Sequence, residues 1–254
     1  MDVNSTLVVG GAAALVVDTL STPAQAADLA AAVRRLTPLP WLVVNTHHHF
    51  DHAYGNQVFA GQPGCQIWGH QEAARRLAAL TPRHLAALAD EWGQTEPELA
   101  ELADVTVTPP TRTIRDTARL DLGGLAVELR HFGRGHTDGD IVAHVPDEQV
   151  LVAGDLVEVG APPGFEDAYP LEWPHTVAEL LHLATGPVVP GHGAVTDQAY
   201  VKAQHDELNT LAWLIRDGHA DDADPHDVAS HAPFGPEAAL VAVRRGYAEL
   251  SGRA

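Results

Sequence analysis

The sequence predicts an α/β protein in which two β-sheets are enclosed by helices, a four-layer αβ/βα sandwich. Short apolar runs typical of buried strands recur along the chain, and amphipathic stretches typical of helices separate them. The expected strands come in two series with helices outside them. A chain of 254 residues, of which 45% are hydrophobic, can bury a core of this size.

The first elements are two strands and a helix. The segment 7–17 is apolar throughout, and Gly10-Gly11 within it predicts a hairpin turn. A helix is expected from about residue 23 to residue 36, with Ser21 or Thr22 as its N-cap.

The same amino-terminal stretch imitates a signal peptide, since Ala24-Gln25-Ala26 resembles a cleavage site. Asp2 nevertheless stands where a signal peptide carries basic residues. The single cysteine, Cys65, excludes an intrachain disulfide, so no oxidising compartment is implied. We therefore predict a cytoplasmic protein.

The remaining elements follow from the same patterns. Strands are expected at about 41–45, 66–68, 113–116, 125–130, 141–145, 150–153 and 187–189. Helices are expected at about 51–59, 70–90, 174–184, 197–216 and 237–250. The proline-containing segment 91–112 is expected to form a flap or insertion, and residues 217–236 a linker. We assign residues 1–216 to one domain, with 217–254 as a linker and carboxy-terminal helical extension of it.

A histidine-rich run, Thr-His-His-His-Phe-Asp-His, directly follows the strand expected before residue 46. Imidazole and carboxylate groups are ligands of Zn²⁺. Residues i and i+2 of an extended chain face the same way, so His47 and His49 can converge on one metal. Asp51 and His52 come as the chain turns into a helix and can face a second position. His48 points away and is interpreted as structural; a polar turn is the alternative for the whole run.

Three further candidate ligands lie downstream, each after a predicted strand and next to glycine. They are His136 in Gly-His-Thr-Asp-Gly-Asp, Asp155 in Ala-Gly-Asp-Leu, and His192 in Pro-Gly-His-Gly. Small residues allow the backbone to come close to an ion. The downstream motifs therefore favour a metal site over a polar turn.

Together the histidine-rich run and the three downstream motifs resemble the metallo-β-lactamase superfamily in order and spacing, over roughly residues 5–200. The resemblance implies the four-layer αβ/βα metallo-β-lactamase sandwich and two Zn²⁺ ions per chain, with Fe or Mn as alternatives. It implies that a first metal is held by His47, His49 and His136, that a second is held by Asp51, His52 and His192, and that Asp155 bridges them. Asp51 and Asp155 are then the expected catalytic residues, with Thr46 and Asp140 as hydrogen-bond partners of the imidazoles.

The resemblance implies a metal-dependent hydrolase that attacks a small ester, thioester, lactone or amide with a metal-bridging hydroxide. The metal site is similar to that of glyoxalase II, but the carboxy-terminal segment offers only Arg244-Arg245 as a basic cluster. Main-subclass zinc β-lactamases carry cysteine at the position of Asp155 and a basic residue at that of Glu158. These differences favour neither the glyoxalase II activity nor the β-lactamase activity.

The substrate mouth is expected in the segment 158–173. Its aromatic residues Phe165, Tyr169 and Trp173 offer apolar surface for an acyl group, and the alternative is that they pack onto the sheet. The expected partner is a small, neutral or weakly charged molecule.

Other functions of the same fold are a mononuclear iron persulfide dioxygenase, a phosphodiesterase and a non-catalytic metal-binding module. A net charge of −19 argues against nucleic acid as a partner. No run of apolar residues is long enough for a membrane span. The composition is compatible with a homodimer.

Overall fold

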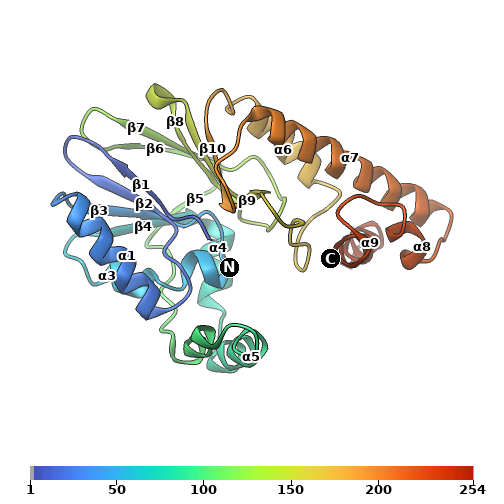
Figure 1. Ribbon diagram of the computed structural model, residues 1–254, viewed down its shortest axis with the longest axis horizontal. Coiled ribbons are helices and arrows are strands. Elements are labelled where there is room, and N and C mark those ends of the chain that lie inside the picture. The colour runs from blue at the N-terminus through green and yellow to red at the C-terminus, as the bar shows by residue number, and fades with distance from the viewer. Residues whose placement is uncertain (1–2, 254) are drawn as a thin grey trace. The chain divides into compact units, whose positions relative to one another are not determined.

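The computed structural model describes residues 3–253, which fall into two compact units, one from Val3 to Arg130 and one that begins at His131. The strands belong to two five-stranded sheets, in the orders β1-β2-β3-β4-β5 and β10-β9-β8-β7-β6 (Figure 1). The predicted α/β class with two sheets is confirmed. Among the described residues no helix is both long and apolar enough to cross a bilayer. The assignment of residues 1–216 and 217–254 stays a prediction.

The first sheet lies entirely in the amino-terminal unit. Its strands are β1 (Thr6–Val9), β2 (Ala14–Val17), β3 (Trp41–Val44), β4 (Gln66–His70) and β5 (Arg112–Ile114). β1 and β2 form the expected antiparallel hairpin, and β2 to β5 run parallel. Parallel strands end at one edge, so the residues that follow β2 and β3 are neighbours.

Helices α1 (Pro23–Leu36) and α3 (Asn56–Ala60) cover one face of this sheet (Figure 1). Thr22 caps α1, as expected, in a capping box with Gln25. Alternate residues of the central strands, among them Val16, Val43 and Ile67, pack against these two helices in a fully buried cluster. The central strands are thereby held rigidly where the histidine-rich run begins.

Two helices expected as single elements are broken. α2 (Phe50–Ala53) ends before Gly55, where the chain lies so close to Thr19 that a Cβ atom on residue 55 would be 1.9 Å from the Thr19 carbonyl oxygen. Pro82 starts a new helix, α5 (Pro82–Trp92), after α4 (Gln71–Ala78).

The segment expected to be loose contains a 3₁₀ helix, η1 (Pro97–Asp104), which packs on α5 through Leu99 and Leu102. The unit closes with the antiparallel pair β6 (Thr117–Asp121) and β7 (Ala126–Arg130). β6 was not expected as a separate strand, because its exposed Arg119 and Asp121 hide the short apolar pattern.

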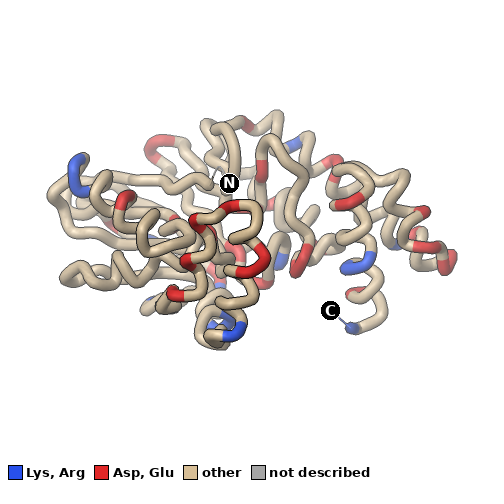
Figure 2. Tube along the Cα trace, turned by 60° about the horizontal axis from the view of Figure 1, so that its bottom comes forward, with Lys and Arg blue, Asp and Glu red and all other residues tan. Residues whose placement is uncertain are grey.

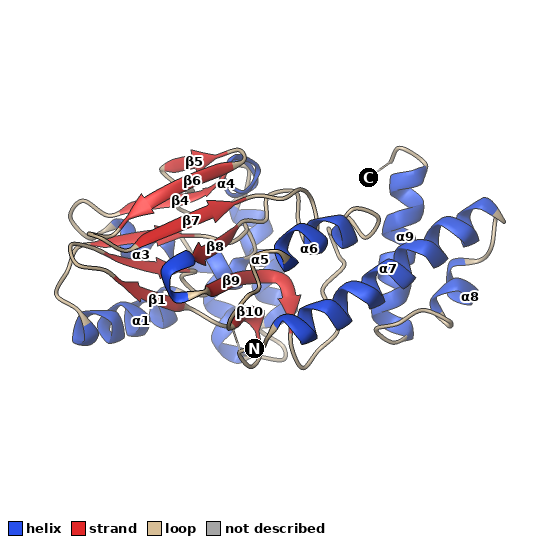
Figure 3. Ribbon diagram, turned by 90° about the horizontal axis from the view of Figure 1, so that it is seen from above, coloured by secondary structure: helices blue, strands red, loops and turns tan. Residues whose placement is uncertain are grey.

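The carboxy-terminal unit contains three strands and most of the long helices. In chain order they are β8 (Val142–Val145), the 3₁₀ turn η2 (Pro146–Glu148), β9 (Val150–Glu158), α6 (Trp173–Leu181), β10 (Val188–His192), α7 (Gln198–Ala220), α8 (Pro225–Ala229) and α9 (Pro236–Leu250). β9 pairs antiparallel with β8 and parallel with β10. α7 runs along α6 and packs against α9, which crosses it (Figure 3). Their apolar faces share one core with β8, β9 and β10.

The expected linker 217–236 is more ordered than its composition indicates. α7 continues to Ala220, and α8 lies within the segment, capped by the Asp224 side chain. Several acidic residues follow one another here, as Figure 2 shows at the end of α7 and in α8. Phe234 has a left-handed backbone (φ 75°), a conformation that is costly for a bulky residue, immediately before α9.

Candidate metal centre

The amino-terminal ligand group, which we define as His47, His49, Asp51 and His52, lies at the carboxyl edge of the first sheet. His47 follows β3 by three residues, and α2 carries Asp51 and His52. The imidazole rings of His47 and His52 have centroids 4.3 Å apart, and those of His47 and His49 are 4.7 Å apart. The structure therefore brings these side chains together as the sequence predicts.

Asp18 is the residue that orders this group. It follows β2, and its N–H donates to the carbonyl of Val44 at the end of β3. Its side chain accepts hydrogen bonds from the N–H and hydroxyl of Thr46, both at 2.7 Å, and it lies 2.8 Å from Nδ1 of His52. Burial raises the pKa of the Asp18 carboxyl, while the bonds from His52 and Thr46 oppose that rise.

These bonds fix the tautomer of two imidazoles. His52 donates Nδ1–H to Asp18, which favours the tautomer of the neutral ring that has no proton on Nε2. Thr46 gives its only hydroxyl proton to Asp18, so Thr46 Oγ1 accepts from Nδ1–H of His47 at 3.0 Å. Both rings therefore present an unprotonated Nε2, which is the form that binds a metal.

The carboxy-terminal ligand group, which we define as His136, Asp155 and His192, lies in the other unit. Asp155 is within β9, His192 ends β10, and His136 is in the loop before β8. His136 Nδ1 lies 3.1 Å from the carbonyl oxygen of Gly164, so the proton resides on Nδ1 and Nε2 again keeps its electron pair. His136 and Asp155 are buried, and His192 is partly exposed.

Ligand-atom spacings support a shared small cation in this group. Asp155 Oδ2 lies 3.5 Å from Nε2 of His136 and 3.3 Å from Nε2 of His192. Ligands about 2.0–2.1 Å from a tetrahedral ion are about 3.3–3.4 Å apart, so both spacings match an edge of such a tetrahedron. Glu158 is a further candidate, since its carboxylate lies within 4.8 Å of the ligand atoms of His136 and Asp155.

A similar spacing occurs in the amino-terminal ligand group, where Nε2 of His52 lies 3.5 Å from Oδ2 of Asp51. The donors in both groups are imidazole nitrogens and carboxylate oxygens only, a set that suits Zn²⁺ and related divalent ions. The residues present thus fit a bound metal.

Gly191 lets β10 lie directly against the Asp155 carboxylate. A Cβ atom at position 191 would be 1.7 Å from Asp155 Oδ1. Asp155 is therefore held between the β9 backbone and a neighbouring main chain, and its carboxylate cannot turn toward Gly191.

The Asp140 carboxylate accepts from the N–H and hydroxyl of Thr137 and so braces the turn after His136. Its expected role as a hydrogen-bond partner of an imidazole stays a prediction. Phe165 and Trp173 are buried in the helical core, and the buried ring of Tyr169 lies against the guanidinium groups of Arg134 and Arg245. The alternative interpretation of these three rings, packing, is the correct one.

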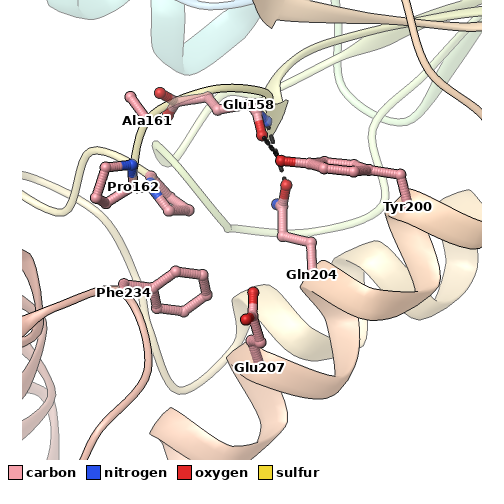
Figure 4. Close-up of a pocket in the computed structure, with 8 residues that line it drawn as sticks. Glu158, Ala161, Pro162, Tyr200, Gln204, Glu207 and Phe234 are labelled. Carbon is pink, nitrogen blue, oxygen red and sulfur yellow. Dashed lines mark hydrogen bonds between the residues drawn. The ribbon is translucent and has the colours of Figure 1, made fainter.

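A pocket of about 180 Å³ opens beside Glu158, and part of its lining comes from the segment 158–173 in which the substrate mouth was expected (Figure 4). It is lined by Glu158, Ala161, Pro162, Pro163, Tyr200, Gln204, Glu207 and Phe234. The Tyr200 hydroxyl donates to the Glu158 carbonyl at 2.7 Å, which ties α7 to the end of β9. Burial and the charges of Glu207 and Glu158 raise the pKa of Tyr200. The pocket is therefore negatively charged.

Two contributors to the ligand groups were missed by sequence reasoning. Asp18 carried a readable signal, because it closes a buried strand that pairs with the strand before the histidine-rich run. Gly164 has no such signal in the sequence, because it contacts His136 through its main-chain carbonyl, a group that every residue has. Thr46 was expected as a hydrogen-bond partner of an imidazole, and its hydroxyl lies 3.0 Å from Nδ1 of His47.

The sequence profile of the metallo-beta-lactamase superfamily matches residues 1–192, about three quarters of the chain. The chain belongs to this superfamily. The family expected from the spacing of the motifs is thereby confirmed, and the match ends at His192, the last predicted ligand.

Individual relatives are distant. The chain is 30% identical over 177 residues to the metallo-beta-lactamase type 2 of Bacillus cereus, which covers 68% of this chain and 57% of that protein. It is 30% identical over 141 residues to the acyl-coenzyme A thioesterase MBLAC2 of Gallus gallus, covering 54% of this chain and 49% of that protein. The chain thus spans about half the length of the relatives that it matches.

Among solved structures, a metallo-beta-lactamase from Pontibacter korlensis aligns with a TM-score of 0.65 and 22% identity, covering 82% of this chain and 87% of that one. This likeness confirms the metallo-β-lactamase fold.

Proposed function

We propose that this member of the superfamily is a zinc-dependent hydrolase of small acyl compounds and that its two ligand groups hold two metal ions. In this proposal the first ion is held by His47, His49 and His136, the second by Asp51, His52 and His192, with Asp155 shared. The observation that carries it is the hydrogen bonding at Nδ1 of His47, His52 and His136, which favours the Nδ1–H tautomer, the form of imidazole that binds a metal through Nε2.

The bracing of His52 favours two ions over one. A mononuclear iron dioxygenase needs only His47, His49, His136 and Asp155, whereas Asp18 fixes the orientation of His52, a ligand of the second position. His192 also faces Asp155 at ligand spacing. A mononuclear site would leave these side chains without a function.

Bound metal ions would supply a Lewis acid and would lower the pKa of a water toward neutrality. Within the chain, Asp51 would hold a proton of the attacking water, since its carboxylate faces the ligand atoms of His52. Glu158 and Glu207 would disfavour anionic substrates in the pocket beside β9.

The names of two relatives support an acyl substrate. A β-lactamase and an acyl-coenzyme A thioesterase both cleave a bond at an acyl carbon, although the bonds differ. Esters, thioesters, lactones and amides share this electrophilic carbonyl. The acidic composition, with a net charge of −19, argues against the phosphodiesterase alternative because a polyanionic substrate would be repelled.

The test combines elemental analysis with a substrate panel. Purified protein should contain two zinc ions per chain and should hydrolyse an aryl ester, thioester or lactone faster than a bis-aryl phosphodiester. Metal-free protein and the same protein reloaded with zinc serve as paired controls. One tightly bound iron without zinc would contradict the dinuclear site, and a phosphodiester cleaved about tenfold faster would make the chain a phosphodiesterase.

A further inference from the structure

The loop between β9 and α6, residues 159–172, makes two main-chain contacts with the segment that carries His136. The carbonyl of Gly164 accepts from His136 Nδ1 at 3.1 Å. The N–H of Tyr169 donates to the carbonyl of Gly135 at 2.8 Å. The orientation of the His136 imidazole therefore depends on where this β9–α6 loop lies.

Arg245 on α9 holds the loop from the side. Its Nε donates to the carbonyl of Ala168 at 3.1 Å, and a terminal nitrogen donates to that of Asp167 at 3.3 Å. Its guanidinium carbon also lies 5.8 Å from the ring centre of Tyr169, and that of Arg134 lies 4.2 Å from it. The part of the loop that contacts Gly135 is thus fixed by two cationic side chains.

α9 is a rigid base for this contact. Ala242 and Val243, just before Arg245, are fully buried in the core of the unit. Gly246 lies so close to α7 that a Cβ atom there would be 2.5 Å from Cγ2 of Ile215. A second contact joins this region to the loop: the rings of Phe234, just before α9, and Phe165 have centres 5.7 Å apart.

We propose that Arg245 is a positioning residue for His136 and acts through the β9–α6 loop. Its guanidinium keeps Asp167 and Ala168 in place, and the loop then keeps the Gly164 carbonyl against Nδ1 of His136. α9 lies beyond residue 192, where the superfamily match ends, so this support comes from a part of the chain that the family profile does not include. The inference rests on the proposed role of His136 as a metal ligand.

The test compares Arg245→Gln with Arg244→Gln, a matched change at the exposed neighbouring residue on the same helix. The first readout is the tautomer of His136 in metal-free protein, from nitrogen-15 NMR with the signal assigned through a His136→Gln variant. The second is zinc affinity by competition with a chromophoric chelator. Arg245→Gln should reduce the Nδ1–H tautomer and lower zinc affinity by about tenfold or more, whereas Arg244→Gln should match the unmodified protein.

Thermal unfolding separates positioning from mere stabilisation. A lower Tm for Arg245→Gln with unchanged tautomer and zinc affinity would overturn the proposal. If Arg245→Gln does not fold, Arg245→Lys keeps the charge but loses the paired donors, and the same two readouts decide. A chain that binds no zinc would refute the proposed function, while the tautomer measurement would still decide the role of Arg245.

Discussion

The carboxylate of Asp18 accepts a hydrogen bond from Nδ1 of His52 at 2.8 Å, although 34 residues separate the two in sequence. The same carboxylate reaches His47 through the hydroxyl of Thr46. A residue outside the ligand set therefore orients two of its imidazoles. The carbonyl of His52 is fixed as well, because it accepts from the N–H of Thr19 and from Nδ2 of Asn45.

Replacing Asp18 with asparagine should weaken metal binding. An amide has one acceptor oxygen, so its NH₂ group would face either the Thr46 N–H or the His52 Nδ1–H and would repel it. We expect zinc affinity to fall about 10- to 100-fold, measured by chelator competition. Asp28→Asn on the exposed face of α1 is the control, and equal affinities in the two variants would contradict the orienting role.

Replacing Asp155 with alanine should abolish turnover while the fold is retained. Asp155 faces both His136 and His192 at ligand spacing, so its loss removes a donor that both metal positions share. Metal content and hydrolysis of an aryl ester measure the effect, and circular dichroism checks the fold. Asp147→Asn, an exposed change in η2, should behave like the unmodified protein. Near-normal activity of Asp155→Ala would remove the shared-ligand assignment.

Charge reversal at Glu207 should alter substrate preference. Glu207 lines the pocket beside Glu158, whereas the neighbouring Asp206 pairs with Lys202. Two acyl esters that differ only in carrying a trimethylammonium or a sulfonate group provide the measurement. Glu207→Lys should shift the ratio of their kcat/KM values toward the anionic ester by about threefold, as expected for a partly solvated charge. Asp206→Lys should leave the ratio unchanged; an equal shift would mean that general surface charge, not the pocket, sets it.

Cys65 should react slowly with alkylating reagents at neutral pH. Burial raises the pKa of its thiol from 9.0 to about 11, so the reactive thiolate is scarce in the folded chain. The rate with iodoacetamide should keep rising with pH beyond 9 in folded protein, while the rate for the chain unfolded in urea levels off. Because the thiolate is disfavoured by folding, the stability that Cys65 contributes is complete below pH 9 and declines as the pH rises toward 11. Identical pH profiles for the two states would refute this.

Local sequence signals predicted most elements of the fold. The hairpin at Gly10-Gly11 and the helix capped by Thr22 form as expected, because turn and cap residues act within a few positions. The break between α2 and α3 was missed, and the glycine that lies at it, Gly55, is required by a close approach to Thr19, 36 residues earlier. Long-range contacts of this kind leave no mark in the local pattern.

The candidate ligands were named from strand ends and glycine neighbours, and the structure brings each group together within its own unit. The groups that hold the ligands in place were harder to find. Arg245 and Gly164 act on main-chain atoms, which every residue has, so residue type does not identify them. The aromatic residues 165, 169 and 173 were expected in a substrate mouth but are buried, because apolar character alone does not distinguish a core residue from a residue that lines a pocket.

The close approach of Gly191 to Asp155 restricts which residues position 191 can accept. No side chain fits at 191, so selection will retain glycine there through any change of substrate. Glu207 differs from Gly191, because it lines the pocket from the exposed side of α7, where a new side chain meets solvent and not a neighbouring main chain. Under the proposed function, a lineage that carries this chain would change its substrate through pocket positions such as Glu207, while Gly191 and Asp155 are inherited unchanged.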